Sequence, residues 1–273
     1  MTIKVFAPAK INLSLHVTGQ RADGYHMLDS LVVFADVADR LDITPADEMS
    51  LDVSGPFSVG VPADASNLVW QASEICGLTA HIRLEKNLPN AAGIGGGSAD
   101  AAAVLRAGEQ LGCSYKASRI TALGADVPVC MTSRPKRMQG IGDQLSDVPS
   151  LPSLWMVLVN PRVSVPTPAV FHALETKTNP AMAAQLPSWA NFTDFCNWLS
   201  DQRNDLETPA ITQQPVIREA LNALSDAPLA RMSGSGATCF GLYASAHLAQ
   251  ASAKRIQTAH PKWWVAAGQV LPE

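Results

Sequence analysis

A glycine-rich segment in the first half of the chain, Gly93-Ile94-Gly95-Gly96-Gly97-Ser98, constrains the local backbone more than any other feature. Residues 98–111 follow it with a helical pattern that ends at Gly112, a residue type suited to the position after a helix. Glycine tolerates positive φ and lets backbone N–H groups approach a ligand, and a helix start adds unpaired N–H donors and a positive dipole end. The segment therefore predicts a cradle for phosphate, although a flexible loop or a tight strand-to-helix turn would use the same residues.

Two better-known phosphate motifs do not fit this segment. A Walker A loop needs a Gly-Lys pair, which the sequence does not contain. A Rossmann fingerprint needs a third glycine and an acidic residue about 20 positions on, whereas Tyr115, Lys116 and Ala117 stand at that distance. The His-Arg-Asp signature of protein kinases is also missing from the sequence.

Composition narrows the class of protein. The 273 residues are 47% hydrophobic and 16% charged, which is typical of a globular chain with room for two domains. The net charge of −4 makes nucleic acid an unfavourable partner. We expect a cytoplasmic protein without membrane contact, because no apolar run is long enough to cross a bilayer and the five scattered cysteines form no C-x-x-C pair.

The order of the predicted elements indicates an α+β fold in two halves. A proline-rich break at residues 148–152 suggests a boundary between domains 1–149 and 150–273. Residues 11–17 alternate in polarity as a half-buried strand does, which would put Lys10, Asn12, Ser14 and His16 on one face. Residues 176–190, rich in proline, alanine and serine, are predicted to form a loop.

Three further short segments carry chemistry. Lys10 and Asn12 stand near the start of the strand, where a lysine is more often solvated than functional. Asp126 lies among apolar residues in Gly-Ala-Asp-Val-Pro and needs a cation or donors if it is buried, but it could equally cap a helix. Residues 233–237, Ser-Gly-Ser-Gly-Ala, could be an ordinary turn between two strands.

Taken in order along the chain, these segments resemble the GHMP kinase superfamily. The four motifs are P-A-K-x-N-L, P-x3-G-x-G-G-G-S, G-A-D-V-P and S-G-S-G-A. Further stretches at residues 18–26, 86–89, 165–168 and 204–207 are similar to the branch that phosphorylates a cytidylated methylerythritol alcohol. The resemblance extends from about residue 5 to about residue 268.

This resemblance implies a two-domain GHMP kinase fold with the active site in the inter-domain cleft. It implies ATP and Mg²⁺ as cofactors, and a small cytidylated molecule as the acceptor, phosphorylated on its 2-hydroxyl for isoprenoid precursor synthesis. We expect a monomer or a weak homodimer. A homoserine or mevalonate type of GHMP kinase and a catalytically inactive nucleotide-binding protein remain alternatives.

The resemblance also assigns roles to residues. Asp126 would be the base, with Lys10 as its cationic partner, and Ser98 a candidate near Mg²⁺. The residues carried over to nucleotide binding are Asn67, Lys86, Pro89, Ala91, Ala92, Gly93, Ile94, Gly95, Gly96, Gly97, Ser98 and Ala99. Those carried over to acceptor binding are Asn12, Tyr25, His26, Asp126, Thr167, Pro168 and Phe171, with Tyr25 and Phe171 expected on the two faces of the cytosine ring and His26 at its edge.

Two departures from the family pattern stand out. Ala91 and Ala92 occupy positions where many relatives have glycine, which narrows the backbone freedom before the glycine segment. Residues 176–192 match no family feature, so no site is assigned to them.

Overall fold

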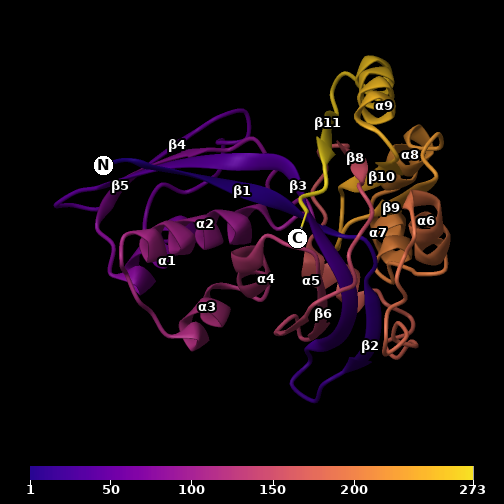
Figure 1. Cartoon of the computed structure of the whole chain (residues 1–273), viewed down its shortest axis with the longest axis horizontal. Helices are drawn as coiled ribbons and strands as arrows, with labels where there is room; N and C mark the ends of the chain where they lie inside the picture. Colours follow the sequence, from indigo (N-terminus) through magenta and orange to yellow (C-terminus); the bar gives the residue numbers. More distant parts are fainter. Residues whose placement is uncertain (273) are drawn as a thin grey trace. The chain divides into compact units, whose positions relative to one another are not determined.

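The computed structural model describes residues 1–272, and its contacts divide the chain into two compact units. The first unit comprises residues 1–10, 38–90 and 95–133, and the second comprises residues 11–37, 91–94 and 134 onward. Strands β1 (Ile3–Asn12) and β3 (His26–Pro45), the long strands at the indigo end of the colour scale in Figure 1, each contribute to both units. For this reason the division is discontinuous, and the expected boundary between residues 149 and 150 falls inside the second unit.

The first unit combines a small sheet with four helices. Strand β5 (Ala80–Glu85) pairs antiparallel with the end of β3 and parallel with β4 (Ser50–Ser54). The helices are α1 (Leu68–Cys76), α2 (Gly96–Gln110), α3 (Ala117–Leu123) and α4 (Val127–Thr132). Helix α2 buries a run of alanines, whose small side chains permit close packing against α1 and α4.

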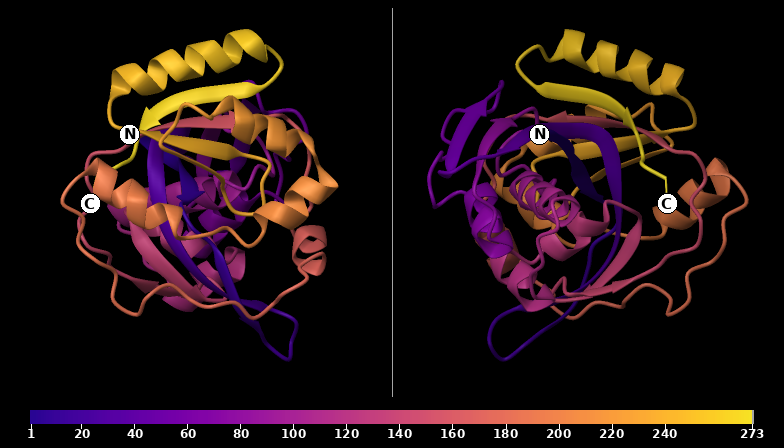
Figure 2. Two further views of the ribbon diagram at one scale, coloured as in Figure 1. Left: turned by 90° about the vertical axis from the view of Figure 1, so that its right-hand side faces the viewer. Right: turned by 60° about the vertical axis from the view of Figure 1, so that its left-hand side comes forward.

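The second unit contains an antiparallel sheet in the order β11 (Trp264–Gln269), β8 (Trp155–Asn160), β10 (Cys239–Tyr243) and β9 (Leu229–Met232). Helix α9 (Ala246–Ala259) runs alongside β11 in both views of Figure 2. The remaining helices are α5 (Thr167–His172), α6 (Phe192–Ser200), α7 (Glu207–Gln213) and α8 (Val216–Ala223). The pairing of β9 with β10 confirms the predicted strands on either side of residues 233–237.

The second unit also holds the start of β3 together with β2 (His16–Gln20), β6 (Lys136–Gly140) and β7 (Gln144–Ser146). Strand β3 pairs antiparallel with β2 and β6, and β6 pairs with β7. The predicted single strand over residues 11–17 is wrong, because the chain leaves the β1 ladder after Asn12. Leu15 instead exchanges backbone hydrogen bonds with Arg203 and Asp205 before β2 begins.

Within residues 1–272, none of the helices has both the length and the apolar composition that a membrane crossing requires.

Candidate active site

Lys10 and Asp126 form an ion pair in the first unit. The Nζ atom of Lys10 lies 2.6 Å from Oδ2 of Asp126, with the lysine side chain 5% exposed and the aspartate 32% exposed. Asp126 occupies the N-cap position of α4, but its side chain makes no capping hydrogen bond. Of the two sequence-based interpretations of Asp126, the observed geometry is therefore the one with a cationic partner, and the carboxylate keeps one side open to solvent.

The second half of the glycine segment begins helix α2 next to this pair. Gly95 is the N-cap residue, with a left-handed φ of 64° and no side-chain cap. A Cβ added to Gly95 would lie 3.2 Å from Cβ of Lys10, so the segment passes close to the lysine stem. The first N–H groups of a helix lack intrahelical acceptors, so α2 offers donors and the positive end of its dipole beside Lys10.

The first half of the glycine segment is packed within the second unit. Gly93 has a φ of 74°, and a Cβ there would lie 2.5 Å from the carbonyl oxygen of Ser233 and 2.8 Å from the backbone nitrogen of Gly236. The Ser233 hydroxyl donates to the Gly93 carbonyl at 2.9 Å, and the Thr238 N–H donates to the Ala92 carbonyl at 3.2 Å. The turn at residues 233–237 therefore packs against the first half of the glycine segment and holds it in place.

At position 91, where many relatives have glycine, the alanine adopts a strained backbone conformation. Its φ is 48°, in the left-handed region that glycine adopts without strain and alanine does not.

The ammonium group of Lys86 is engaged inside the first unit. It contacts Asp100 of α2 at 2.7 Å and also Asp39 of β3, and all three side chains are buried. Burial opposes the charged form of Lys86, but the two aspartates outweigh it and raise its pKa. Burial also raises the pKa of Asp100, against the opposing effect of Lys86.

Asn67, which was also carried over to nucleotide binding, uses its side chain to cap the start of α1. Its amide oxygen accepts from the Val69 N–H at 2.9 Å, and its amide nitrogen donates to the Pro62 carbonyl at 2.6 Å. Sequence reasoning missed Asp39 and Asp100. The one local signal was a carboxylate, Asp100, set in an alanine-rich buried helix, where it requires a partner.

Apart from Asp126, the expected acceptor residues lie in the second unit. His26 and Phe171 are stacked, with ring centroids 4.7 Å apart and an interplanar angle of 24°. Tyr25 is 61% exposed, and the ring stacked on Phe171 is that of His26 and not that of Tyr25. Burial, with a smaller effect of Lys177, lowers the pKa of His26, which favours the neutral ring. Its Nε2 atom is buried and has no hydrogen-bond partner among the described residues.

Asn12 is buried and held from two sides. Its backbone N–H donates to the Ser233 hydroxyl at 3.1 Å, and its amide nitrogen donates to the Ser30 hydroxyl at 2.8 Å. Its amide oxygen has no hydrogen-bond partner within residues 1–272, which leaves an acceptor available for a ligand. Thr167, at the start of α5, shares a hydrogen bond of 2.7 Å with Ser235. Residues 233–235 therefore contact both Asn12 and Thr167.

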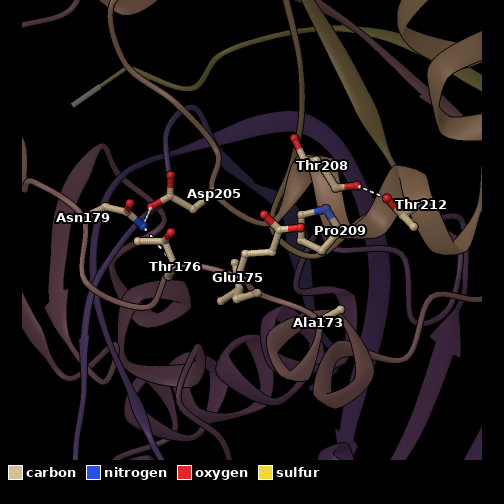
Figure 3. Close-up of a pocket in the computed structure, with 9 residues that line it drawn as sticks. Ala173, Glu175, Thr176, Asn179, Asp205, Thr208, Pro209 and Thr212 are labelled. Atoms are coloured by element: carbon tan, nitrogen blue, oxygen red, sulfur yellow. Dashed lines mark hydrogen bonds between the residues drawn. The ribbon is translucent and has the colours of Figure 1, made fainter.

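A hollow of ≈ 270 Å³ lies in the second unit between residues 173–179 and α7 (Figure 3). Thr208, Pro209 and Thr212 form one side of it, and Asn179 and Asp205 lie on the other. None of the residues expected to bind nucleotide or acceptor lines this hollow.

Residues 1–272 contain no group of three or more histidine, cysteine or acidic side chains that could hold a metal. Mg²⁺ in phosphoryl transfer is usually held by one or two protein oxygens together with substrate phosphates. The Ser98 hydroxyl, in the first turn of α2, and the half-exposed Asp126 carboxylate are oxygen donors of the type this ion prefers.

Comparison with known proteins gives a consistent result. The model for the GHMP kinases N terminal domain matches residues 65–147, and that for the GHMP kinases C terminal matches residues 182–264. The chain is 56% identical to the 4-diphosphocytidyl-2-C-methyl-D-erythritol kinase of Ruegeria pomeroyi, covering 99% of this chain and 100% of that one. It is also 56% identical to the enzyme of that name from Dinoroseobacter shibae, over 96% and 92% of the two chains.

Among solved structures, a crystal structure of 4-(cytidine 5'-diphospho)-2C-methyl-D-erythritol kinase matches with a TM-score of 0.78 and 30% identity, over 99% of this chain and 100% of that one. The homoserine kinase of Cytophaga hutchinsonii matches with a TM-score of 0.64 and 18% identity, over 98% and 95% of the two chains, which is a likeness of fold alone.

Proposed function

The chain belongs to the GHMP kinases, in the family of 4-diphosphocytidyl-2-C-methyl-D-erythritol kinases, and we propose from this membership that it transfers the γ-phosphoryl group of ATP to the 2-hydroxyl of that cytidylated alcohol. The product is the 2-phosphate, an intermediate in isopentenyl diphosphate biosynthesis. The observation that carries the proposal is the Lys10–Asp126 ion pair beside the glycine-rich start of α2.

The nucleotide phosphates bind at the glycine segment in this proposal. The N–H groups of residues 96–98 at the start of α2 face no intrahelical acceptor and can donate to phosphate oxygens. Ser98 is the residue proposed to reach Mg²⁺, which when bound would neutralise charge on the phosphates. Lys86 stabilises this region from within the first unit, because its ammonium group pairs with Asp39 of β3 and with Asp100 of α2.

Asp126 is the proposed acceptor of the substrate proton. As the 2-hydroxyl oxygen bonds to the γ-phosphorus, its proton passes to the Asp126 carboxylate and the bond from phosphorus to the bridging oxygen breaks, so ADP leaves with the electron pair. Phosphoryl transfer has a loose transition state, so positioning and charge neutralisation contribute more than strong base catalysis. The Lys10 ammonium both fixes the carboxylate and supplies positive charge beside the transferred group.

The cytidine part of the acceptor is assigned to Tyr25, His26 and Phe171. A flat base stacks on aromatic faces without needing a charge. The unpartnered Nε2 of His26 offers a hydrogen-bonding group for the base edge, and the unpartnered amide oxygen of Asn12 offers one for a hydroxyl of the acceptor. Thr167 and Pro168 would line the same pocket.

Acceptor discrimination tests this proposal. ADP release is followed in a coupled assay with the cytidylated alcohol, homoserine and mevalonate as separate acceptors, and the product is examined by ³¹P NMR for a new phosphomonoester. We expect turnover with the cytidylated alcohol alone. Turnover only with homoserine or mevalonate would overturn the assignment of the acceptor, and ATP binding without turnover on any of the three would point to an inactive nucleotide-binding protein.

A further inference from the structure

The irregular segment of residues 176–190, called here the strap, connects α5 to α6 in the second unit. A connection of this length without helix or strand is uncommon in a compact domain and is often functional. Three side chains of the strap are buried, those of Met182, Leu186 and Trp189. Trp189 packs edge-on against Phe195 of α6, with ring centroids 4.9 Å apart. The strap is therefore seated on the unit along its length.

A buried ion pair holds the middle of the strap. Nε of Arg137 donates to Oδ1 of Asp29 and Nη2 donates to Oδ2, both at 2.7 Å. The same guanidinium donates to the backbone carbonyls of Met182 at 3.2 Å, Ala183 at 2.8 Å and Ala184 at 2.9 Å. The Met182 N–H completes the network by donating to Oδ2 of Asp29 at 2.9 Å. All five donors of the guanidinium are thereby used.

The net contribution of such a network to the stability of the fold is small. Removing two charges from water costs several kcal/mol per ion, so buried pairs are often no more stabilising than apolar side chains of the same volume. What the pair does achieve is a fixed geometry, since a planar fork that serves two carboxylate oxygens and three carbonyls tolerates little displacement.

The geometry that it fixes is adjacent to the acceptor residues. Asp29 lies in β3 three residues after His26, and the next residue, Ser30, is the one that holds the amide of Asn12. The far end of the strap continues from α5, the helix that carries Thr167 and Phe171. The strap thus ties the strand that carries His26 to the helix that carries the ring stacked on it.

The strap also covers residues 14–17, which follow Asn12 along the chain. The Ser14 hydroxyl lies 3.3 Å from Sδ of Met182, Nδ1 of His16 lies 3.2 Å from the Pro180 carbonyl, and the Asn179 N–H donates to the Val17 carbonyl at 3.0 Å. These contacts place the strap on the polar side of the chain that leads away from Asn12.

We propose that Arg137 is a positioning residue for the acceptor: with Asp29 it holds the strap on β3 and thereby fixes the spacing between His26 and Phe171. The inference rests on the proposed function, because it assigns to these two rings the binding of the cytidine. The side-chain hydrogen bonds of Arg137 go to Asp29 and to residues 182–184, and none of them reaches the glycine segment.

The test compares Arg137→Met, Arg137→Lys and Asp29→Asn with the wild type. We expect Arg137→Met to raise KM for the cytidylated acceptor by about 10- to 100-fold, the range that an ångström-scale misplacement produces, with KM for ATP within about twofold. Arg137→Lys keeps the charge but has three donors in place of five, so it should recover only part of the loss. Binding of cytidine 5'-diphosphate and of ADP, measured by calorimetry without turnover, should show the same split.

Two control variants separate positioning from general destabilisation. Arg255→Met removes another arginine that pairs with an aspartate, Asp226, and a carbonyl, on α9. Ile256→Ala opens a cavity in the core under the same helix. Both should leave the two KM values unchanged, even where Ile256→Ala lowers the melting temperature more than Arg137→Met does.

An unchanged acceptor KM in Arg137→Met, or equal losses for acceptor and ATP, would overturn the positioning role. If Arg137→Met fails to fold, Asp29→Asn decides the matter by the same criterion, because it preserves the shape of the site. A wild type that turns over no cytidylated acceptor and binds no cytidine 5'-diphosphate refutes the proposed function instead, and this outcome is visible before any variant is made.

Discussion

Replacing Gly93 with alanine tests whether the turn at residues 233–237 dictates the glycine segment. The new Cβ would lie 2.5 Å from the Ser233 carbonyl oxygen and 2.8 Å from both the nitrogen and the oxygen of Gly236. These are backbone atoms, so no rotamer change relieves the contact. The left-handed φ of 74° costs alanine about 1–2 kcal/mol, and forcing an extra methyl into packed structure costs about 1–3 kcal/mol more. We expect Gly93→Ala to destabilise the protein by about 2–5 kcal/mol.

Gly60 provides a matched control. Its φ is 80°, close to that of Gly93, but a Cβ there would have nothing within 4 Å. Gly60→Ala should therefore cost only the conformational term of about 1–2 kcal/mol. The assay is urea unfolding of both variants, with the midpoint and slope compared separately, together with KM for ATP. We expect a raised KM for ATP in Gly93→Ala alone. Equal destabilisation by the two variants would refute the argument, because it would mean that the close approach to Ser233 and Gly236 carries no energy.

Further predictions concern the reaction, the departure at Ala91 and the response to pH. Asp126→Ala should lower kcat by about 10²-fold or more while ATP affinity, followed by calorimetry, changes little; an equal loss of ATP binding would make Asp126 structural. Tyr25→Ala should weaken the binding of cytidine 5'-diphosphate and leave ADP binding intact, both measured by calorimetry. Ala91→Gly should raise the free energy of unfolding by about 1 kcal/mol, because the φ of 48° strains alanine; no gain in the unfolding midpoint would contradict this. Burial and Arg203 lower the pKa of His16, so the folded state binds fewer protons than the unfolded one, and stability should fall as the pH drops through about 6.5. Unfolding midpoints at pH 7.5 and 5.5 should differ less in His16→Gln than in the wild type.

Features that depend on neighbouring residues could be predicted from the sequence. The family, the mixed α/β character and the strands on either side of residues 233–237 were predicted correctly. The strand predicted over residues 11–17 was wrong because alternation in polarity does not reveal where the chain changes its pairing partner, which here moves from β3 to residues 203–205.

The hydrogen-bond and ion-pair partners of individual side chains were less predictable from the sequence. Lys86 and Asn67 were expected beside the nucleotide, and the roles assigned to them remain predictions, but their side chains are engaged by Asp39, Asp100, Val69 and Pro62. The expected placement of Tyr25 and Phe171 around a base also remains a prediction. His26, assigned to the base edge, is the ring that stacks on Phe171.

The sequence by itself determined what the glycine segment is suited to bind, because positive φ, close backbone approach and a helix start are properties of consecutive residues. The tertiary structure decided which side chains meet, although the family resemblance had already implied that Lys10 is the partner of Asp126. Lys10 and Asp126 are 116 positions apart, and Asp29 and Arg137 are 108 apart. Those pairings follow from strand register and helix packing, which depend on the whole chain and leave no mark in any short stretch of it.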